Sequence, residues 1–280
     1  MTVSKPQHVA ISGAGGQLGR ALVDVLSPVA TLLSVSDRDI NALEGLARTG
    51  PEAGPEEAPK DGPKERRASI HTAPVDVGDG DALRLWLAAC RERGRLDWMI
   101  VNAGLGGPAP EGSLGEDPLR TAALIDVNLR AAIEQCRLAS EMMIADGGGR
   151  IVLISSLSAK IGYPQAPVYA ATKAGLRAYG LSMAARLAGT GVGITIALPG
   201  FLSRGMAENS SWRPFSMAPR QAARKIVRAA SSGRTETAFP GSMSAAVGAL
   251  GLLPASLRGT IYRRWSGQRQ SVHERQGMLR

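Results

Sequence analysis

The chain has 280 residues, at the upper end of what one α/β domain holds, and its 44% hydrophobic and 20% charged residues fit a globular protein with a buried core. The net charge is +9, and after Gly200 there are 13 Lys and Arg against three Asp and Glu. We interpret this basic region as a solubilising surface, although it would also suit an anionic lipid or an acidic substrate. The sequence contains neither a zinc-binding spacing nor a basic–aromatic alternation, so we expect no bound metal and no nucleic-acid partner.

Cysteine use and the N-terminus indicate the compartment. Cys90 and Cys136 lie far apart, in no metal-binding or redox spacing, which predicts two buried thiols in a reducing environment. Residues 1–7 are polar and lead directly into an apolar strand, without the basic and apolar regions of a signal peptide. No apolar run is long enough to span a bilayer. We therefore expect a cytoplasmic protein.

Short apolar, β-branched runs alternate along the chain with segments of helical periodicity. Strands are predicted over residues 8–12, 31–36, 69–75, 96–101, 150–155 and 193–198. Helices are predicted over residues 17–26, 40–47, 79–93, 119–145 and 168–187. This alternation favours a parallel sheet with helices on both faces, which is a doubly wound α/β fold.

Two regions depart from the alternation. Residues 49–67 are rich in Pro, Gly and Glu and have almost no apolar side chains, which predicts a flexible loop. Beyond Gly200 we predict a helix over residues 218–230 and a last edge strand over 237–239. Residues 243–265 are apolar and then basic, with Pro254 in the middle. We therefore expect one domain over residues 1–240, with residues 241–280 as a helical basic extension of it.

A glycine-rich turn follows the first predicted strand. It comprises Ser12, Gly13, Ala14, Gly15, Gly16, Gln17, Leu18 and Gly19, and a helix follows. Glycines let a backbone turn tightly and approach a pyrophosphate, whose charge suits the free N–H groups at a helix start. The second strand then ends at Asp37 and Arg38. An acidic residue about 20 positions after such a turn suits the ribose hydroxyls of NAD, whereas Arg38 could pair with the 2′-phosphate of NADP.

Tyr169 and Lys173 lie four residues apart at the start of a predicted helix and so share one face. A tyrosine is a poor base at neutral pH, and a nearby ammonium group lowers its pKa. Such a pair suits proton transfer to or from an alcohol. Ser155 and Ser156 end the fifth strand, where the carboxyl ends of parallel strands meet a ligand. The run Asn102, Ala103 and Gly104 ends the fourth strand in the same way.

Taken together and in this order, these residues resemble the short-chain dehydrogenase/reductase family over residues 9–206. The resemblance implies a Rossmann fold and a catalytic set of Asn128, Ser156, Tyr169 and Lys173. It implies that Tyr169 moves the proton and that Lys173 holds the ribose hydroxyls and lowers the Tyr169 pKa. It also implies that Ser156 fixes the substrate oxygen and that Asn128 positions a relay water.

The same resemblance extends to the cofactor contacts. Beyond the glycine-rich turn, Asp37, Arg38, Tyr169 and Lys173, it assigns contacts to Asp76, Val77, Asn102, Ala103, Gly104, Pro199, Gly200 and Leu202. Two positions depart from the family. Gln17 stands where the shorter members of the family have a glycine, and Arg204, beside Ser203, stands where the family often has a threonine.

The resemblance implies an NAD(P)-dependent oxidoreductase that interconverts a secondary alcohol and a ketone by direct hydride transfer. Asp37 favours NAD, and NADP stays possible. We expect an apolar small-molecule substrate, with Lys160, Tyr163 and Gln165 as contacts. The alternatives are a non-catalytic NAD-binding regulatory or scaffold protein and a sugar-nucleotide epimerase or dehydratase.

Two expectations concern larger partners. Family members usually pair through the helices predicted over 119–145 and 168–187, so we expect a homodimer or homotetramer. Residues 243–265 could contact an anionic membrane, but we favour a helical lid or a subunit contact over the substrate pocket.

Overall fold

The computed structural model describes residues 6–46, 67–110, 113–203 and 216–265. Almost all of the predicted loop over 49–67 lies outside these residues, as does Arg204. The described chain forms a seven-stranded parallel sheet in the order β3-β2-β1-β4-β5-β6-β7. The strands are β1 (His8–Ser12), β2 (Leu32–Asp37), β3 (Ser69–Pro74), β4 (Trp98–Val101), β5 (Gly149–Ile154), β6 (Val192–Pro199) and β7 (Glu236–Phe239).

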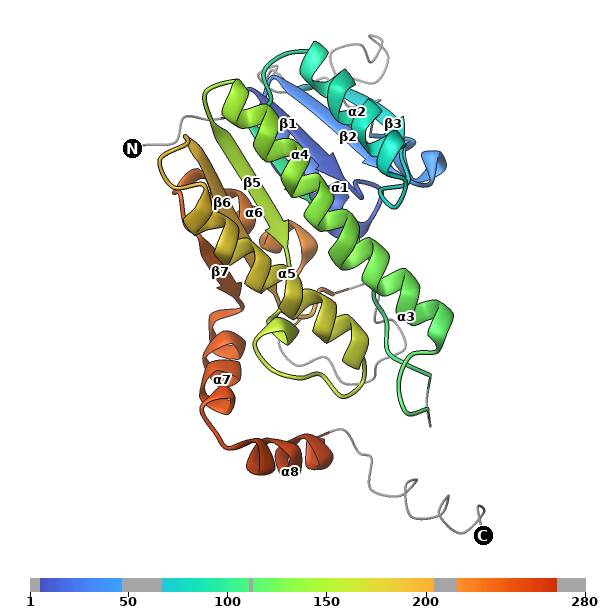
Figure 1. Ribbon diagram of the computed structural model, residues 1–280, viewed down its shortest axis with the longest axis vertical. Helices are drawn as coiled ribbons and strands as arrows, with labels where there is room; N and C mark the ends of the chain where they lie inside the picture. The colour runs from blue at the N-terminus through green and yellow to red at the C-terminus, as the bar shows by residue number, and fades with distance from the viewer. Residues whose placement is uncertain (1–5, 47–66, 111–112, 204–215, 266–280) are drawn as a thin grey trace, which may run out of the picture.

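Helices cover both faces of this sheet (Figure 1). On one face lie α1 (Gln17–Leu26) and α6 (Pro219–Ser231), which pack against each other. On the other face lie α2 (Gly80–Glu92), α4 (Ala132–Ala145) and α5 (Pro167–Arg186). The predicted doubly wound α/β fold is therefore confirmed. After β7 the chain continues into α7 (Gly241–Gly251) and α8 (Ala255–Trp265), which extend beyond the sheet (Figure 1).

The strands carry apolar side chains at almost every position because both faces are buried. Val152 and Ile154 of β5 pack into the core on the α1 and α6 side, whereas Ile151 and Leu153 pack on the α2, α4 and α5 side. Successive side chains of a strand point to opposite faces, so a sheet with two covered faces needs a continuous apolar run. The two covered faces therefore account for the unbroken apolar runs from which the strands were predicted.

The structure corrects two predicted helices. In the predicted helix over 40–47, the described residues 40–46 contain only a 3-10 turn, η1 (Ile40–Leu43). Asp39 caps this turn, and Gly45 follows it in the left-handed conformation with a φ of 83°. Residues 119–145 form α3 (Pro118–Ile125), a π-helical turn η3 (Asp126–Ala131) and α4. The expected helical extension over 241–280 forms α7 and α8 in its described part. The two helices are separated at Pro254, since proline disfavours helix in the residue before it.

Two predictions concerned the cysteine thiols and membrane-spanning segments. Cys90 and Cys136 are both buried free thiols, as predicted, and burial raises the pKa of each to about 11. Among the described helices, none combines the length and the apolar character needed to cross a membrane.

Candidate active site

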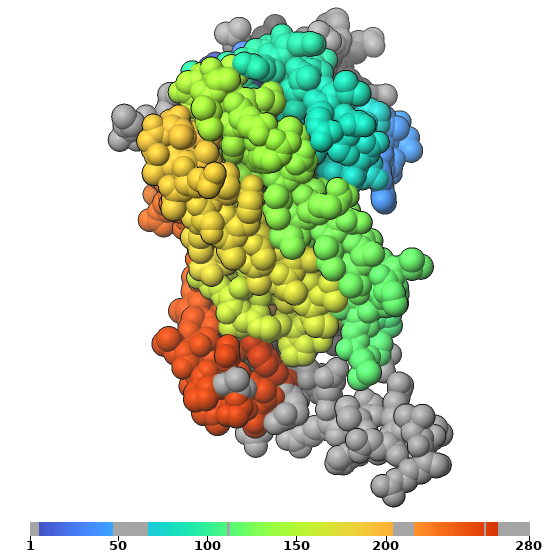
Figure 2. Space-filling model, viewed as in Figure 1, coloured from blue at the N-terminus to red at the C-terminus, as the bar shows by residue number. Residues whose placement is uncertain are grey.

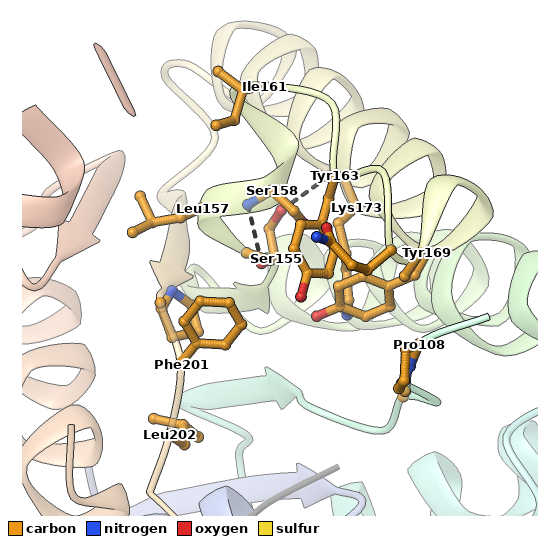
Figure 3. A pocket seen from close by; sticks show the side chains of 18 of the residues that line it. Pro108, Ser155, Leu157, Ser158, Ile161, Tyr163, Tyr169, Lys173, Phe201 and Leu202 are labelled. Atoms are coloured by element: carbon orange, nitrogen blue, oxygen red, sulfur yellow. Dashed lines mark hydrogen bonds between the residues drawn. The ribbon is translucent and has the colours of Figure 1, made fainter. Parts of the chain in front are cut away.

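The loops after β1, β4, β5 and β6 meet at one edge of the sheet, where they border a cavity of about 710 Å³ (Figure 3). Parallel strands place all of their carboxyl ends at the same edge, which is where open α/β sheets bind ligands. The cavity runs from the start of α1 at Gly16 to Tyr169 and Lys173 on α5. One continuous space therefore joins the glycine-rich turn to the predicted acid/base pair.

The glycine-rich turn is shaped by bonds to the loop after β4. The Ser12 hydroxyl is buried and accepts hydrogen bonds from the main-chain N–H groups of Asn102 and Ala103, both at 3.2 Å. The Asn102 side-chain amide donates to the carbonyls of Ser12 and Gly13 at 3.1 and 2.8 Å. Gly13 has a φ of 65°, and a Cβ there would lie 2.6 Å from the Ala103 Cα. Ser12, Ala103 and Asn102 thus fix the turn.

The start of α1 is open to a ligand. Its N-cap is Gly16, which offers no side-chain cap, so the first N–H groups of the helix keep their hydrogen-bonding capacity for an anion. Gln17 is exposed at the first helical position and borders the cavity together with Leu18. Gly19 is packed so closely on Gly13 and Ala14 that a Cβ would lie 2.6 Å from the Ala14 Cα.

Asp37 closes the far side of this turn. Its Oδ2 accepts a hydrogen bond from the Gly15 N–H at 3.0 Å, and a Cβ on Gly15 would lie 2.9 Å from the same oxygen. Arg38 beside it is exposed. An adenine dinucleotide contains a pyrophosphate next to a ribose that carries hydroxyl groups. The start of α1 suits the pyrophosphate and Asp37 suits the ribose hydroxyls, so these residues fit an adenine dinucleotide.

Asp76 and Val77 follow β3 and do not border the cavity. Asp76 is exposed and accepts a hydrogen bond from the Gly78 N–H at 2.8 Å, while Val77 is buried. Their predicted contact with an adenine stays a prediction.

Lys173 lies at the centre of the site and is 5% exposed. Its Nζ donates to the Ile154 carbonyl at 2.9 Å and lies 5.8 Å from the centroid of the Tyr169 ring. Burial lowers the pKa of Lys173 to about 8. Gly104 makes room for this ammonium group, because a Cβ there would lie 3.4 Å from Nζ and 3.1 Å from the Asn128 Oδ1.

Asn128 is buried within the π-helical turn η3. Its Oδ1 accepts from the Leu105 N–H at 2.7 Å, and its Nδ2 donates to the Leu105 carbonyl at 2.9 Å. Both side-chain atoms therefore hold the loop after β4 beside Lys173. A π-helical turn inside a helix is frequently found at functional sites, and here it places a polar side chain inside the protein.

Tyr169 lies in the first turn of α5, and an acidic residue from a distant loop caps that turn. The Glu116 carboxylate accepts from the main-chain N–H groups of Val168 and Tyr169 at 3.2 and 3.3 Å. Sequence reasoning missed Glu116, because it lies more than 50 residues before Tyr169 and has no local signal.

The pKa of Tyr169 differs from the sequence expectation. Burial raises this pKa, the hydrogen bond with Ser156 lowers it and the nearby Tyr163 raises it further. Figure 3 shows the hydroxyl groups of Tyr163 and Tyr169 lying toward one another. In the ligand-free protein the net effect is therefore a raised pKa rather than the lowering that Lys173 was expected to cause, because both side chains are desolvated.

The two serines after β5 have different positions. The Ser155 hydroxyl is buried and donates to the Lys173 carbonyl at 2.9 Å, which ties β5 to α5. The Ser156 hydroxyl accepts from the Ser158 N–H at 3.1 Å and is the partner of Tyr169. This arrangement agrees with the choice of Ser156 over Ser155 as the predicted catalytic serine.

The remaining wall of the cavity is mostly apolar. It contains Leu105, Pro108, Leu157, Ile161, Tyr163, Pro164, Gln165, Phe201, Leu202, Met243, Val247, Leu250 and Tyr262, besides Pro199 and Gly200. The rings of Tyr163 and Phe201 meet edge to face, with centroids 6.2 Å apart. The helices α7 and α8 thus contribute directly to the cavity.

Of the three expected substrate contacts, Tyr163 and Gln165 border the cavity and Lys160 does not. The Lys160 ammonium instead pairs with the Glu236 carboxylate at 3.3 Å, which Arg177 also binds at 2.6 Å. The expectation for Lys160 is therefore wrong, because its charge is satisfied outside the pocket. The main-chain N–H of Ser203 donates to the Met217 carbonyl at 3.0 Å.

Comparisons with known proteins show the family to which the chain belongs. The family described as short chain dehydrogenase matches residues 7–213 of the chain. An uncharacterized oxidoreductase of Mycobacterium tuberculosis is 36% identical over 145 residues, which cover 51% of this chain and 56% of that protein. A ketoacyl reductase of Nostoc sp. is 34% identical over 171 residues, which cover 58% of each chain. Both matches thus span less than two thirds of the relatives.

The structure of levodione reductase has a TM-score of 0.69 and 25% sequence identity to this chain. The superposition covers 86% of this chain and 98% of that chain. The similarity therefore extends over most of this chain.

The buried charge of Lys173 predicts a dependence of stability on pH. Its pKa is about 8 in the folded protein and 10.5 for an ordinary lysine. Below pH 8 both states are protonated and the cost of burial is fully present, whereas between pH 8 and 10.5 the unfolded state binds more protons, so stability rises. We would measure the free energy of unfolding of wild type and of Lys173→Met with denaturant. From pH 7 to 9.5, the free energy of wild type should rise relative to that of the variant by about 2 kcal/mol.

The matched control is Lys225→Met, which removes an exposed lysine of α6. The difference in free energy of unfolding between this variant and wild type should stay constant from pH 7 to 9.5. If the free energy of unfolding of Lys173→Met differed from that of wild type by the same amount at every pH, the result would contradict the burial of the Lys173 ammonium group.

Proposed function

The chain belongs to the short-chain dehydrogenase family, and we propose that it is an NAD(P)-dependent oxidoreductase that interconverts a secondary alcohol and a ketone. The observation that carries the proposal is the single cavity that borders the uncapped start of α1, Ser156, Tyr169 and Lys173. A regulatory protein would have no need of a proton-transfer pair at the end of its nucleotide site. The described C-terminal helices add to this cavity. The spacing of the glycines in the turn after β1 is the feature that suggests the alternative, a sugar-nucleotide enzyme.

The cofactor would be held by groups at the start of α1 and at the end of β2. The N–H groups at the start of α1 suit its pyrophosphate, and Asp37 suits the hydroxyls of its adenosine ribose. We propose further contacts from Gly104, Pro199, Gly200 and Leu202, which border the same cavity. When bound, the nicotinamide supplies the hydride acceptor or donor, which no side chain can supply.

The residues of this chain supply the proton transfer. Tyr169 would donate its hydroxyl proton to a ketone oxygen, or accept a proton from an alcohol, and Ser156 would fix that oxygen by a hydrogen bond. Lys173, with a pKa near 8, is protonated at neutral pH and would stabilise the tyrosinate that forms. The apolar wall excludes water, which strengthens each of these interactions.

We also propose that the chain self-associates as a homodimer or homotetramer. Leu119 and Ile125 of α3, Ile144 of α4 and Leu181 of α5 are between 39% and 85% exposed. Figure 2 shows α4 and α5 side by side on one face of the molecule, which is the arrangement that a shared helical interface needs. Light scattering should give a multiple of 29.2 kDa at micromolar concentration, and a species of only that mass would count against this.

Removing the tyrosine hydroxyl tests the proposed chemistry. Tyr169→Phe should lower NADH-dependent reduction of apolar ketones by about 10²–10⁴-fold, because general acid catalysis is lost while the ring still fills the cavity. Cofactor affinity should change little. The rate is measured as loss of NADH absorbance with a panel of ketones, and Tyr179→Phe, on α5 outside the cavity, is the control. Retention of more than about a tenth of the activity in Tyr169→Phe would refute the role of Tyr169.

The cofactor preference depends on the charge of Asp37. Wild type should bind NADH at least about tenfold more tightly than NADPH, because the carboxylate repels a 2′-phosphate. Asp37→Asn keeps an oxygen for the Gly15 N–H and should bring the two affinities, measured by calorimetry, close together. Asp24→Asn removes an exposed charge from α1 and should leave the ratio unchanged. A wild type that prefers NADPH would overturn the proposal.

A further inference from the structure

One polar group in the cavity wall has no role in the proposed reaction. Tyr262 belongs to α8, and it borders the cavity among apolar side chains of α7, namely Met243, Val247 and Leu250. Its hydroxyl oxygen is buried and has no hydrogen-bond partner in the described part of the chain. Buried hydroxyls in native proteins almost always have a partner, because leaving one unpaired is costly. A buried, unpaired hydroxyl in a cavity wall therefore indicates a partner that arrives with the ligand.

The surroundings of Tyr262 define what kind of partner this is. Burial raises the pKa of Tyr262, and the positive charge of Arg258 only partly opposes this rise. The hydroxyl is thus protonated at neutral pH and can donate a hydrogen bond. Arg258 lies one turn earlier on the same helix, and its Nε is also buried without a partner among the described residues. Two neighbouring donors favour an oxygen acceptor.

Tyr262 lies on a different wall of the cavity from the catalytic residues. Figure 1 shows α7 leading away from the end of β7 and α8 lying at its far end. Ser156 and Tyr169, in contrast, come from the end of β5 and the start of α5. The cavity therefore has polar groups at its catalytic end and on its α8 wall, with mostly apolar walls otherwise.

We propose that the substrate is a mostly apolar keto or hydroxy compound with a second oxygen remote from the reacting carbon, and that Tyr262 binds this second oxygen. Tyr262 is then a specificity-determining residue. This inference rests on the proposed function, and it narrows the substrate class from any apolar ketone to one with two oxygen functions. A site built to hydrogen-bond a substrate oxygen discriminates strongly against an analogue that lacks it.

The test compares ketones that differ only in the second oxygen. We would use 2-octanone with 8-hydroxy-2-octanone, and 2-undecanone with 11-hydroxy-2-undecanone, and measure their binding by calorimetry to the protein–NAD complex, which cannot reduce a ketone. In wild type, the hydroxyketone of at least one pair should bind about tenfold or more tightly than the plain ketone. Tyr262→Phe should abolish this advantage and leave the affinity for the plain ketone and for NADH unchanged. Tyr179→Phe, outside the cavity, should keep the advantage.

A stability measurement separates this role from a structural one. Because the Tyr262 hydroxyl has no partner in the described protein, Tyr262→Phe should leave the Tm of the ligand-free protein equal to that of wild type or higher. A fall of several degrees would overturn the inference, since it would reveal an internal partner.

The other outcomes are equally decisive. The inference would be overturned if wild type bound both ketones of each pair with equal affinity, or bound neither. It would also be overturned if Tyr262→Phe lost affinity equally for both ketones of a pair. Turnover of both ketones without a preference would contradict this inference alone. A preference for the hydroxyketone that Tyr262→Phe removes, without NADH oxidation, would contradict the proposed function and leave the two-oxygen ligand standing.

Discussion

The parallel direction of all seven strands is the constraint on which the site depends. Because β1, β4, β5 and β6 run the same way, their carboxyl ends meet at one edge, although His8 of β1 and Pro199 of β6 are distant in sequence. The crossover helices that this topology requires also bury both faces of the sheet. A rigid, two-sided core therefore holds the glycine-rich turn, the serine loop and the start of α5 in fixed relation.

The second property of this edge of the sheet is the desolvation of its functional side chains. Lys173 is buried with a main-chain carbonyl as its partner, and the low polarity around it changes the pKa of both Lys173 and Tyr169. Desolvation thus disfavours the charged forms that proton transfer would need. We infer that the ligands that complete the site restore part of this balance, because hydroxyl groups beside Lys173 would solvate its charge. Close approach at Gly104, where a Cβ would lie 3.4 Å from the Lys173 Nζ, leaves little room for a side chain there to do so.

Local sequence signals predicted most of the fold. The bounds of β1 and α1 agree with the prediction, because an apolar run, glycines and a 3.6-residue periodicity lie within one short segment. The π-helical turn at Asn128 was not predicted, since its hydrophobic pattern resembles that of a continuous α-helix. Glu116 and Tyr262 were missed for another reason. Each acts on residues far away in the chain, the first as a cap for α5 and the second as part of the cavity wall, and no local pattern encodes such contacts.

The central claim is that this cavity transfers a hydride directly between a nicotinamide and a substrate carbon. It is tested most directly with NADH that carries deuterium at both C4 positions, and with whichever ketone of the panel is reduced, by mass spectrometry and NMR of the alcohol. We expect one deuterium on the carbinol carbon of each product molecule, because the C4 deuteride would pass directly to the carbonyl carbon while the proton on oxygen comes from Tyr169. A product without deuterium at that carbon, or no consumption of NADH with any ketone, would contradict the account.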